Sequence, residues 1–292
     1  MGVSLQGSLI LGLFRLIGFG LWTIMMVPVQ ASALALKLQH HTVIIPRLFH
    51  RVCARLLGFR LTVIGTPSTR RPTLYVANHS SYMDVVVLGG LIEGSFVAKT
   101  EVAGWPLFGM LAKLQRTVFV ARRVRKVAAE RDDIKTRLLA GDNLILFPEG
   151  TSSDGNRTLP FKSALFSVAS TQINDAPIAV QPISVTCTAL DGIPLGWTLR
   201  SIYAWYGDMD LAPHIWNMVQ LGRLTVVVEF HEPVTLDDFS SRKALAEFCQ
   251  ATIAAGVGRA IAGWPSPTPV FVPSEDTGIE SAESAESIEM PA

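Results

Sequence analysis

The segment TLYVANHSSYMD, residues 73–84, joins a short apolar run to a dense group of polar side chains. Branched and aromatic residues predominate in Thr73–Ala77, which is typical of a buried strand. His79 and Asp84 follow, five positions apart. On a continuous helix that offset turns two side chains about 140° away from each other, so a contact between them needs a turn. The segment therefore predicts a strand, a turn that can hold a His–Asp pair, and a helix after it.

Outward from this segment, short apolar runs alternate with helix-like stretches. Strands are expected at 61–64, 73–77, 96–98, 117–120, 143–147, 178–185 and 224–230. Helices are expected at 83–91, 106–114, 124–139, 162–172 and 241–261. This alternation predicts an α/β fold in which a mixed sheet is flanked by helices. Residues 187–222 show no regular pattern, and no element is assigned to them.

Two further polar clusters follow predicted strands. In FPEGTSS, residues 147–153, Glu149 ends an apolar strand, Gly150 permits a tight turn, and hydroxyl and backbone N–H groups come next. In FVAR, residues 119–122, Arg122 can fork onto a phosphate. Each cluster alone has an ordinary alternative, an exposed glutamate in a turn or a solvated arginine. Together with the His–Asp pair they indicate a ligand site, because ligands of α/β sheets gather at strand ends.

Residues 1–60 contain the longest apolar stretch of the chain. The run from Ser8 to Val29 is long enough for a helix to cross the ~30 Å hydrocarbon core of a bilayer. Its single charge, Arg15, is expected to reach back to the near interface, unless the helix lies shallow. Pro28 is expected to kink or end this helix.

A second, amphipathic helix is expected over residues 46–60. Three cations four residues apart lie on one of its faces: Arg47, Arg51 and Arg55. The first acidic residue of the chain is Asp84, so the front of the chain is basic as well as apolar. The two helices therefore predict an anchor in the cell inner membrane that holds the rest of the chain at the cytoplasmic face.

A cleaved signal peptide is the alternative for this region. Ala31-Ser32-Ala33 resembles a cleavage site. However, no lysine or arginine precedes Arg15, so the positive segment that starts a signal peptide is missing. The sequence favours the anchor.

Composition excludes several classes of protein. Apolar residues make up 49% of the 292 residues and charged residues 17%, which excludes a disordered chain and a nucleic-acid binder that relies on bulk positive charge. Three cysteines are too few for a disulfide framework, and no metal site is indicated. Residues 265–292 hold six acids and no base, which leaves 25 bases against 18 acids in the rest of the chain. We expect this acidic end to be disordered.

The set of motifs, in this order, resembles the glycerolipid acyltransferase family, in particular 1-acylglycerol-3-phosphate acyltransferases. The family block N-H-x-x-x-x-D is matched by Asn78, His79 and Asp84, and F-P-E-G-T-x-S is complete over residues 147–153. Looser blocks are matched by Ala98, Lys99, Glu101, Pro106 and Gly109, by Phe119, Val120 and Arg122, and by Pro182. The sequence departs from the family at two positions: the glycine of G-x-x-F-[IV]-x-R falls on Arg116, and Ala121 precedes the final arginine.

The resemblance implies transfer of a fatty acyl group from acyl carrier protein or coenzyme A to the free hydroxyl of 1-acylglycerol-3-phosphate, giving phosphatidic acid. No metal and no cofactor beyond the thioester donor is implied. His79 would take the proton of the hydroxyl, and Asp84 would orient the resulting imidazolium. The implied partners are membrane lipids, the lysophospholipid acceptor and the thioester donor, but no nucleic acid.

The resemblance also implies a set of substrate-binding residues. Arg122, with Lys99, would hold the phosphate of the acceptor. The headgroup would be positioned by residues of the second motif: Glu149, Gly150, Thr151 and Ser153.

The chain is thus expected to divide into anchoring helices (1–60), an acyltransferase domain (61–264) and a disordered acidic tail (265–292). The departures at Arg116 and Ala121 lie in the acceptor block, so lyso-ornithine lipid or another lysophospholipid is an alternative acceptor. A lipid hydrolase would need a G-x-S-x-G elbow, but residues 150–154 read GTSSD. A scaffold without activity is disfavoured by the intact motifs.

Overall fold

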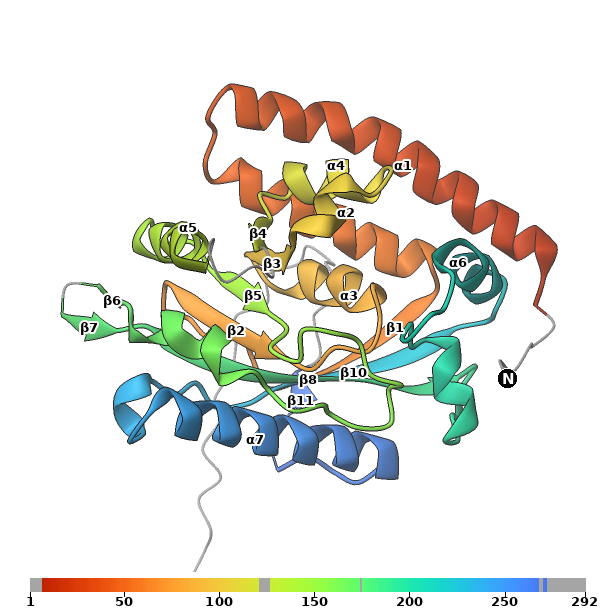
Figure 1. Cartoon of the computed structure of the whole chain (residues 1–292). Helices are drawn as coiled ribbons and strands as arrows, with labels where there is room; N and C mark the ends of the chain where they lie inside the picture. The colour runs from red at the N-terminus through yellow and green to blue at the C-terminus, as the bar shows by residue number, and fades with distance from the viewer. Residues whose placement is uncertain (1–6, 121–126, 174, 268–269, 272–292) are drawn as a thin grey trace, which may run out of the picture.

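The computed structural model of the chain describes residues 7–120, 127–173, 175–267 and 270–271. Its centre is a nine-stranded sheet in the order β11-β1-β10-β8-β2-β5-β3-β4, with β9 paired to β8 (Figure 1). The strands of this sheet are β1 (Phe59–Ile64), β2 (Thr73–Ala77), β3 (Ser95–Lys99), β4 (Val118–Val120), β5 (Leu144–Leu146), β8 (Ala179–Leu190), β9 (Ile193–Pro194), β10 (Leu224–Phe230) and β11 (Val270–Phe271). A small separate sheet pairs β6 (Gln172–Ile173) with β7 (Ala176–Pro177).

The predicted α/β fold with a mixed sheet is confirmed. β2 runs parallel to β5 and β8, and β3 runs parallel to β5 and β4, whereas β8 and β10 are antiparallel. Four neighbouring parallel strands, β2, β5, β3 and β4, therefore place their carboxyl ends at one edge of the sheet. The polar segments of the sequence follow β2 and β5, so the fold brings them together there.

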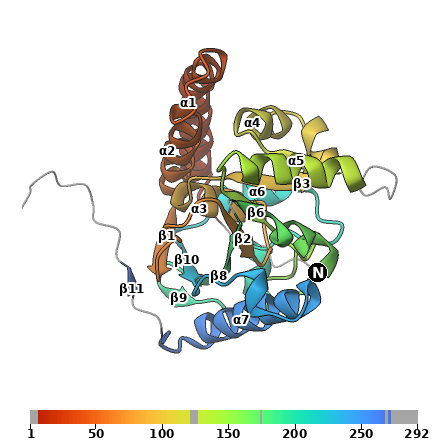
Figure 2. The same cartoon turned by 90° about the vertical axis from the view of Figure 1, so that its left-hand side faces the viewer.

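Helices cover both faces of the sheet. They are α1 (Leu9–Ala35), α2 (His41–Leu56), α3 (Met83–Leu91), α4 (Phe108–Leu114), α5 (Val127–Leu139), α6 (Leu211–Val219) and α7 (Arg242–Ala262). Because side chains alternate along a strand, Tyr75 and Ala77 of β2 pack in a core with α2 and α3, while Leu74 and Val76 pack with α5 and α7. Figures 1 and 2 show α7 on one side of the sheet and α1, α2 and α3 on the other.

The outermost helix, α1, is attached to the domain along one side. It packs on α2, α4 and α6, and its other side exposes large apolar residues. These include Leu9, Ile10, Leu13, Phe14, Ile17, Leu21, Ile24, Met25 and Val29. Within the described ranges, α1 is the one helix long and apolar enough to cross a membrane. The apolar outer side of a helix fixed to the protein indicates membrane association.

The expectation that the side chain of Arg15 reaches back to the membrane interface is wrong. Its side chain is buried, and the guanidinium donates to the carbonyl oxygens of Val219, Leu221 and Gly222 at 2.6–3.1 Å. These carbonyls lie at and just after the end of α6, where a helix has no backbone donors of its own for its last carbonyls. Arg15 therefore joins α1 to α6. Pro28 does not end α1 either, because the helix continues to Ala35.

The predicted amphipathic helix corresponds to α2, but two of its arginines contact protein. Arg47 pairs with Glu93 at 2.6 Å, and Arg51 donates to the carbonyl oxygen of Gly90 at 2.8 Å. Both partners lie at or just after the end of α3. Arg55, the third arginine of the row, is exposed. The basic face of α2 thus holds α3, the helix that carries Asp84.

The remaining differences concern short elements. The stretch predicted as a helix at 162–172 is a 3-10 helix over Ser163–Ser170, and the unassigned residues 187–222 contain the end of β8, β9, a 3-10 helix (Thr198–Ile202) and α6. Such short elements give too few turns for a clear period in the sequence. Two further 3-10 helices span Thr100–Gly104 and Leu236–Asp238. In the predicted tail, β11 pairs with β1, and residues 268–269 and 272–292 lie outside the described residues.

Candidate active site

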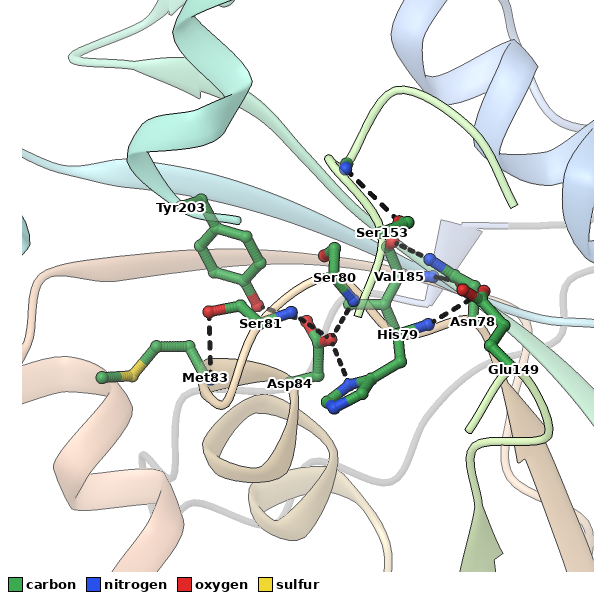
Figure 3. A network of polar contacts seen from close by, with 11 residues as sticks. Asn78, His79, Ser80, Ser81, Met83, Asp84, Glu149, Ser153, Val185 and Tyr203 are labelled. Atoms are coloured by element: carbon green, nitrogen blue, oxygen red, sulfur yellow. Dashed lines mark hydrogen bonds and ion pairs between the residues drawn. The ribbon is translucent and has the colours of Figure 1, made fainter. Parts of the chain in front are cut away.

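His79 and Asp84 form the predicted pair. Nδ1 of His79 lies 2.9 Å from Oδ2 of Asp84, and the turn between β2 and α3 allows the contact (Figure 3). The side chain of His79 is 20% exposed, whereas that of Asp84 is fully buried. With Nδ1 held by the carboxylate, Nε2 is the ring nitrogen that can accept a proton from a ligand.

Asp84 is fixed by more than the histidine. Its Oδ2 also accepts the backbone N–H groups of Ser80 and Ser81 at 2.7 and 2.9 Å, and its Oδ1 accepts the hydroxyl of Tyr203 at 2.7 Å. Hydrogen bonds of this kind fix the position of a carboxylate. A buried carboxylate with four partners is therefore held ready to orient an imidazolium ring.

The backbone of the turn is tied to three other segments. Ser153 N–H donates to the carbonyl oxygen of His79, and Trp205 N–H donates to that of Ser80, both at 2.8 Å. The side chain of Asn78 exchanges two hydrogen bonds of 2.8 Å with the backbone of Val185 on β8. The histidine is thus held by the second motif, by β8 and by the segment before α6.

Glu149 lies beside this turn but is buried. Its Oε1 accepts the backbone N–H of His79 at 3.2 Å, while Oε2 has no hydrogen-bond partner among the residues that the structure describes. Burial, with a smaller contribution from the negative charge of Asp84, raises the pKa of Glu149 to about 8. The carboxyl group is therefore largely protonated at neutral pH, and it accepts a hydrogen bond from the backbone of His79.

This raised pKa predicts a pH-dependent stability. The native protein keeps the Glu149 proton up to about pH 8, whereas the unfolded chain loses it near 4.5. Stability should thus fall as pH rises through this window, by up to about 1.4 kcal/mol per pH unit for this group. Glu149→Gln removes the titration, so urea unfolding at several pH values should show a flatter profile. Parallel profiles would mean that Glu149 is already ionised in the native protein.

The structure describes all but one of the other predicted site residues. Gly150 has a φ of +66°, in the left-handed region that glycine adopts without steric strain. Thr151 is exposed, and Ser153 is buried with its hydroxyl accepting the N–H of Gly155. Lys99 is half-buried at the carboxyl end of β3, the same edge as His79. Arg122 lies outside the described residues. That these residues bind substrate stays a prediction.

Arg116, which stands where the family has glycine, is not part of this site. It precedes β4, at the opposite edge of the sheet from His79. Its φ is +61°, a conformation that glycine adopts most easily. The guanidinium binds Asp142 at 2.8 Å and Thr42 at 3.3 Å, and the carbonyl oxygen accepts a bond from Arg137. The departure from the family motif at Arg116 therefore changes a turn at the opposite end of the strands from His79 and Asp84.

An apolar cavity of about 410 Å³ lies on the side of the sheet that α1, α2 and α3 cover, and Tyr82 and Met83, between His79 and Asp84 in the chain, help to line it. It lies between α1, α2, α3, α4 and α6, the helices that carry or support the apolar outer surface. The ring of His79 stacks on Phe147 with centroids 4.2 Å apart, and Phe147 stacks on Phe96, which lines the cavity. The rings of Phe147 and Phe96 thus connect His79 with this apolar cavity.

The fold places a hydrogen-bonded histidine–aspartate pair at the carboxyl ends of the parallel strands of an α/β sheet. A family model described as Acyltransferase matches residues 60–186. The chain is 44% identical over 223 residues to a lyso-ornithine lipid O-acyltransferase of Brucella abortus, covering 75% of this chain and 84% of the relative. The chain belongs to the acyltransferase family. It is an O-acyltransferase that acts on lysolipids.

Two more distant proteins are also similar. A 1-acyl-sn-glycerol-3-phosphate acyltransferase of Neisseria gonorrhoeae is 29% identical, covering 66% of this chain and 73% of the relative. The crystal structure of the 1-acyl-sn-glycerophosphate acyltransferase PlsC from Thermotoga maritima matches with a TM-score of 0.61 and 23% identity, covering 89% of this chain and 98% of that one. The structural likeness confirms the fold.

Sequence reasoning missed two residues that hold the turn with His79 and Asp84 in place. Tyr203, which binds Asp84, and Trp205, which binds the backbone of Ser80, both come from the stretch that showed no regular pattern. Asp84 and Tyr203 are 119 positions apart, so no local spacing relates them. A buried tyrosine in an irregular, partly apolar segment gave no signal of its own.

Proposed function

We propose that the chain transfers a fatty acyl group to the free hydroxyl of a lyso-ornithine lipid. The observation that carries this proposal is the 44% identity to a relative of that name, against 29% for the 1-acyl-sn-glycerol-3-phosphate acyltransferase. The main acceptor expected from the sequence motifs, 1-acylglycerol-3-phosphate, becomes the second candidate. The hydrogen-bonded His79–Asp84 pair supports either acceptor, because both present a hydroxyl to be deprotonated.

The chemistry follows from the geometry of the pair. Nε2 of His79 takes the proton of the acceptor hydroxyl while the oxygen attacks the thioester carbonyl carbon. A C–O bond forms, the C–S bond breaks, and the leaving thiolate takes the proton back from the imidazolium. Asp84 stabilises the imidazolium through Nδ1, so the acyl group is never attached to the protein.

The donor and the location are proposed from the same features. The donor is the thioester of acyl carrier protein or coenzyme A, and no metal or other cofactor takes part. The basic body suits an acidic donor. The apolar side of α1 would enter the inner membrane and keep the catalytic domain at the cytoplasmic face. Arg122, with Lys99, would hold the anionic group of the acceptor.

A comparison of acceptors tests the proposal. Purified full-length protein in mixed micelles should acylate lyso-ornithine lipid with a kcat/KM at least roughly tenfold higher than 1-acylglycerol-3-phosphate, a difference of about 1.4 kcal/mol in transition-state binding. The two headgroups differ in charge, since ornithine carries an ammonium and a carboxylate where the glycerolipid carries a phosphate. Products are identified by mass spectrometry, with His79→Ala as the background. Equal or reversed kcat/KM values would favour the second candidate.

A further inference from the structure

A segment beyond the family match contacts the turn between β2 and α3. This segment, residues 198–205, follows residues 60–186, which the acyltransferase family model matches. Its Tyr203 hydroxyl donates to Oδ1 of Asp84 at 2.7 Å, and Figure 3 shows the phenol pointing at the carboxylate. The carboxylate of the proposed catalytic pair therefore has a partner that the family match does not include.

The phenol of Tyr203 is held in a fixed position. The residue is 1% exposed, and its ring packs edge-on against Phe59 of β1 with centroids 6.0 Å apart. On one side of it in the chain, the N–H of Tyr203 donates to the carbonyl oxygen of Arg200 at 3.1 Å. On the other side, Trp205 N–H donates to the carbonyl oxygen of Ser80 at 2.8 Å. The backbone on both sides and the packed ring thus direct the hydroxyl at the carboxylate.

The two oxygens of Asp84 differ in their partners. Oδ2 lies against Nδ1 of His79 and accepts the N–H groups of Ser80 and Ser81. Within the described part of the chain, Tyr203 is the one hydrogen-bond donor to Oδ1. Asp84 is fully buried, so without this hydroxyl Oδ1 would be a charged oxygen that has lost its donor in the interior.

Tyr203 can act here only as a donor. Burial, together with the negative charge of Asp84, raises the pKa of Tyr203 well above its usual value, so the phenol keeps its proton. Three other titratable groups interact with Asp84 or Tyr203 from neighbouring segments: Glu149, Cys187 and Tyr82. Burial raises the pKa of each of them as well, so their uncharged forms predominate at neutral pH. The described hydrogen bonds of the Arg200 guanidinium go to Asn156 and Leu195.

We propose that Tyr203 is a positioning residue for the acyl transfer, because its hydroxyl keeps the Asp84 carboxylate aligned with Nδ1 of His79 and takes up part of its negative charge. The carboxylate can then orient the ring without holding the ring proton too tightly, so the proton can pass on to the leaving thiolate. Tyr203 acts through Asp84. The inference rests on the acyl transfer proposed above, but not on which lysolipid is the acceptor.

Tyr203→Phe tests this role, since it removes the hydroxyl and keeps the ring that packs on Phe59. The charge on Asp84 is then more localised and attracts the imidazolium more strongly. We expect the acidic limb of the kcat/KM profile to move to higher pH by about one unit, a roughly tenfold change in the proton affinity of the base. The limiting kcat should fall roughly tenfold, because the carboxylate can turn away from the ring.

Tyr75→Phe is the matched control. Tyr75 is as buried as Tyr203, and its hydroxyl donates to the carbonyl oxygen of Ser68 at 3.2 Å. Both variants lose one hydrogen-bonded phenol hydroxyl, so both should unfold at a somewhat lower urea concentration than the wild type. Only Tyr203→Phe should move the acidic limb. If the two variants move it equally, or if neither moves it, the hydroxyl of Tyr203 has a structural role alone and the proposal is wrong.

A chemical measurement separates this inference from the proposed reaction. Diethyl pyrocarbonate modifies neutral imidazole, and the side chain of His79 is 20% exposed, so the reagent can reach it. The pH of half-maximal modification of His79 reports the protonation of the ring without any acyl transfer. It is followed by mass spectrometry of the peptide that contains His79, with the full-length protein in detergent micelles.

The midpoint of this modification should lie about one pH unit higher in Tyr203→Phe than in the wild type and in Tyr75→Phe. A shifted midpoint in a protein that acylates no lysolipid would contradict the proposed function alone. An unshifted midpoint in a protein that does acylate a lysolipid would contradict this inference alone.

Discussion

Replacing His79 with alanine is expected to abolish nearly all acyl transfer. The change removes the atom that accepts the hydroxyl proton, and general base catalysis contributes about a hundred- to ten-thousandfold to rate. The loss should lie in kcat, because Asp84, Glu149 and the cavity remain in place. Transfer is measured as lipid product formed per enzyme at saturating donor and acceptor.

The fold should survive this substitution. The His79 side chain is 20% exposed, and Asp84 keeps three other hydrogen bonds, from Ser80, Ser81 and Tyr203. His79→Ala should therefore sediment with membranes and unfold in urea like the wild type. Wild-type turnover in a folded His79→Ala protein would show that another group takes the proton, and the proposed mechanism would be wrong.

Replacing Arg15 with methionine is expected to lower the free energy of unfolding by about 3 kcal/mol. Methionine keeps much of the apolar stem but leaves the carbonyls of Val219, Leu221 and Gly222 without the buried guanidinium that binds them. A cation at the end of a helix is also favoured by the helix dipole, and this is lost too. Urea unfolding in detergent micelles measures the change.

An exposed arginine on the adjacent helix provides the matched control. Arg55→Met removes the same charge from α2 at a position in solvent, and its effect should stay below about 0.5 kcal/mol. If Arg15→Met is no more destabilising than Arg55→Met, the contact between α1 and α6 does not stabilise the fold. Such a result would mean that other contacts hold α1 on the rest of the fold.

The sheet and the contact between His79 and Asp84 could be predicted because their signals are local. Apolar runs followed directly by polar residues located β2 and β5, and parallel neighbours bring their ends together. His79, Asp84 and Glu149 all lie within a few residues of such ends, so the sequence placed them in one site. The proximity of Glu149 to the backbone of His79 then follows from the pairing of β2 with β5.

What could not be predicted depends on contacts between distant segments. A single charge in an apolar stretch, Arg15, was expected to reach toward the lipid interface, yet its partners lie more than 200 positions away on and after α6. The burial of Glu149, which raises its pKa, depends on packing that no spacing reveals. The same is true of Tyr203.

The turn at Arg116 changes how the mismatch with the family motif is interpreted. Arg116 has a positive φ, a main-chain conformation that glycine adopts without steric cost. In this chain arginine adopts the same conformation, and its guanidinium is held by the carboxylate of Asp142. The arginine at position 116 therefore gives no information on which lipid the protein accepts. Substitutions meant to change the accepted lipid should be made at the carboxyl ends of the strands, where His79 lies.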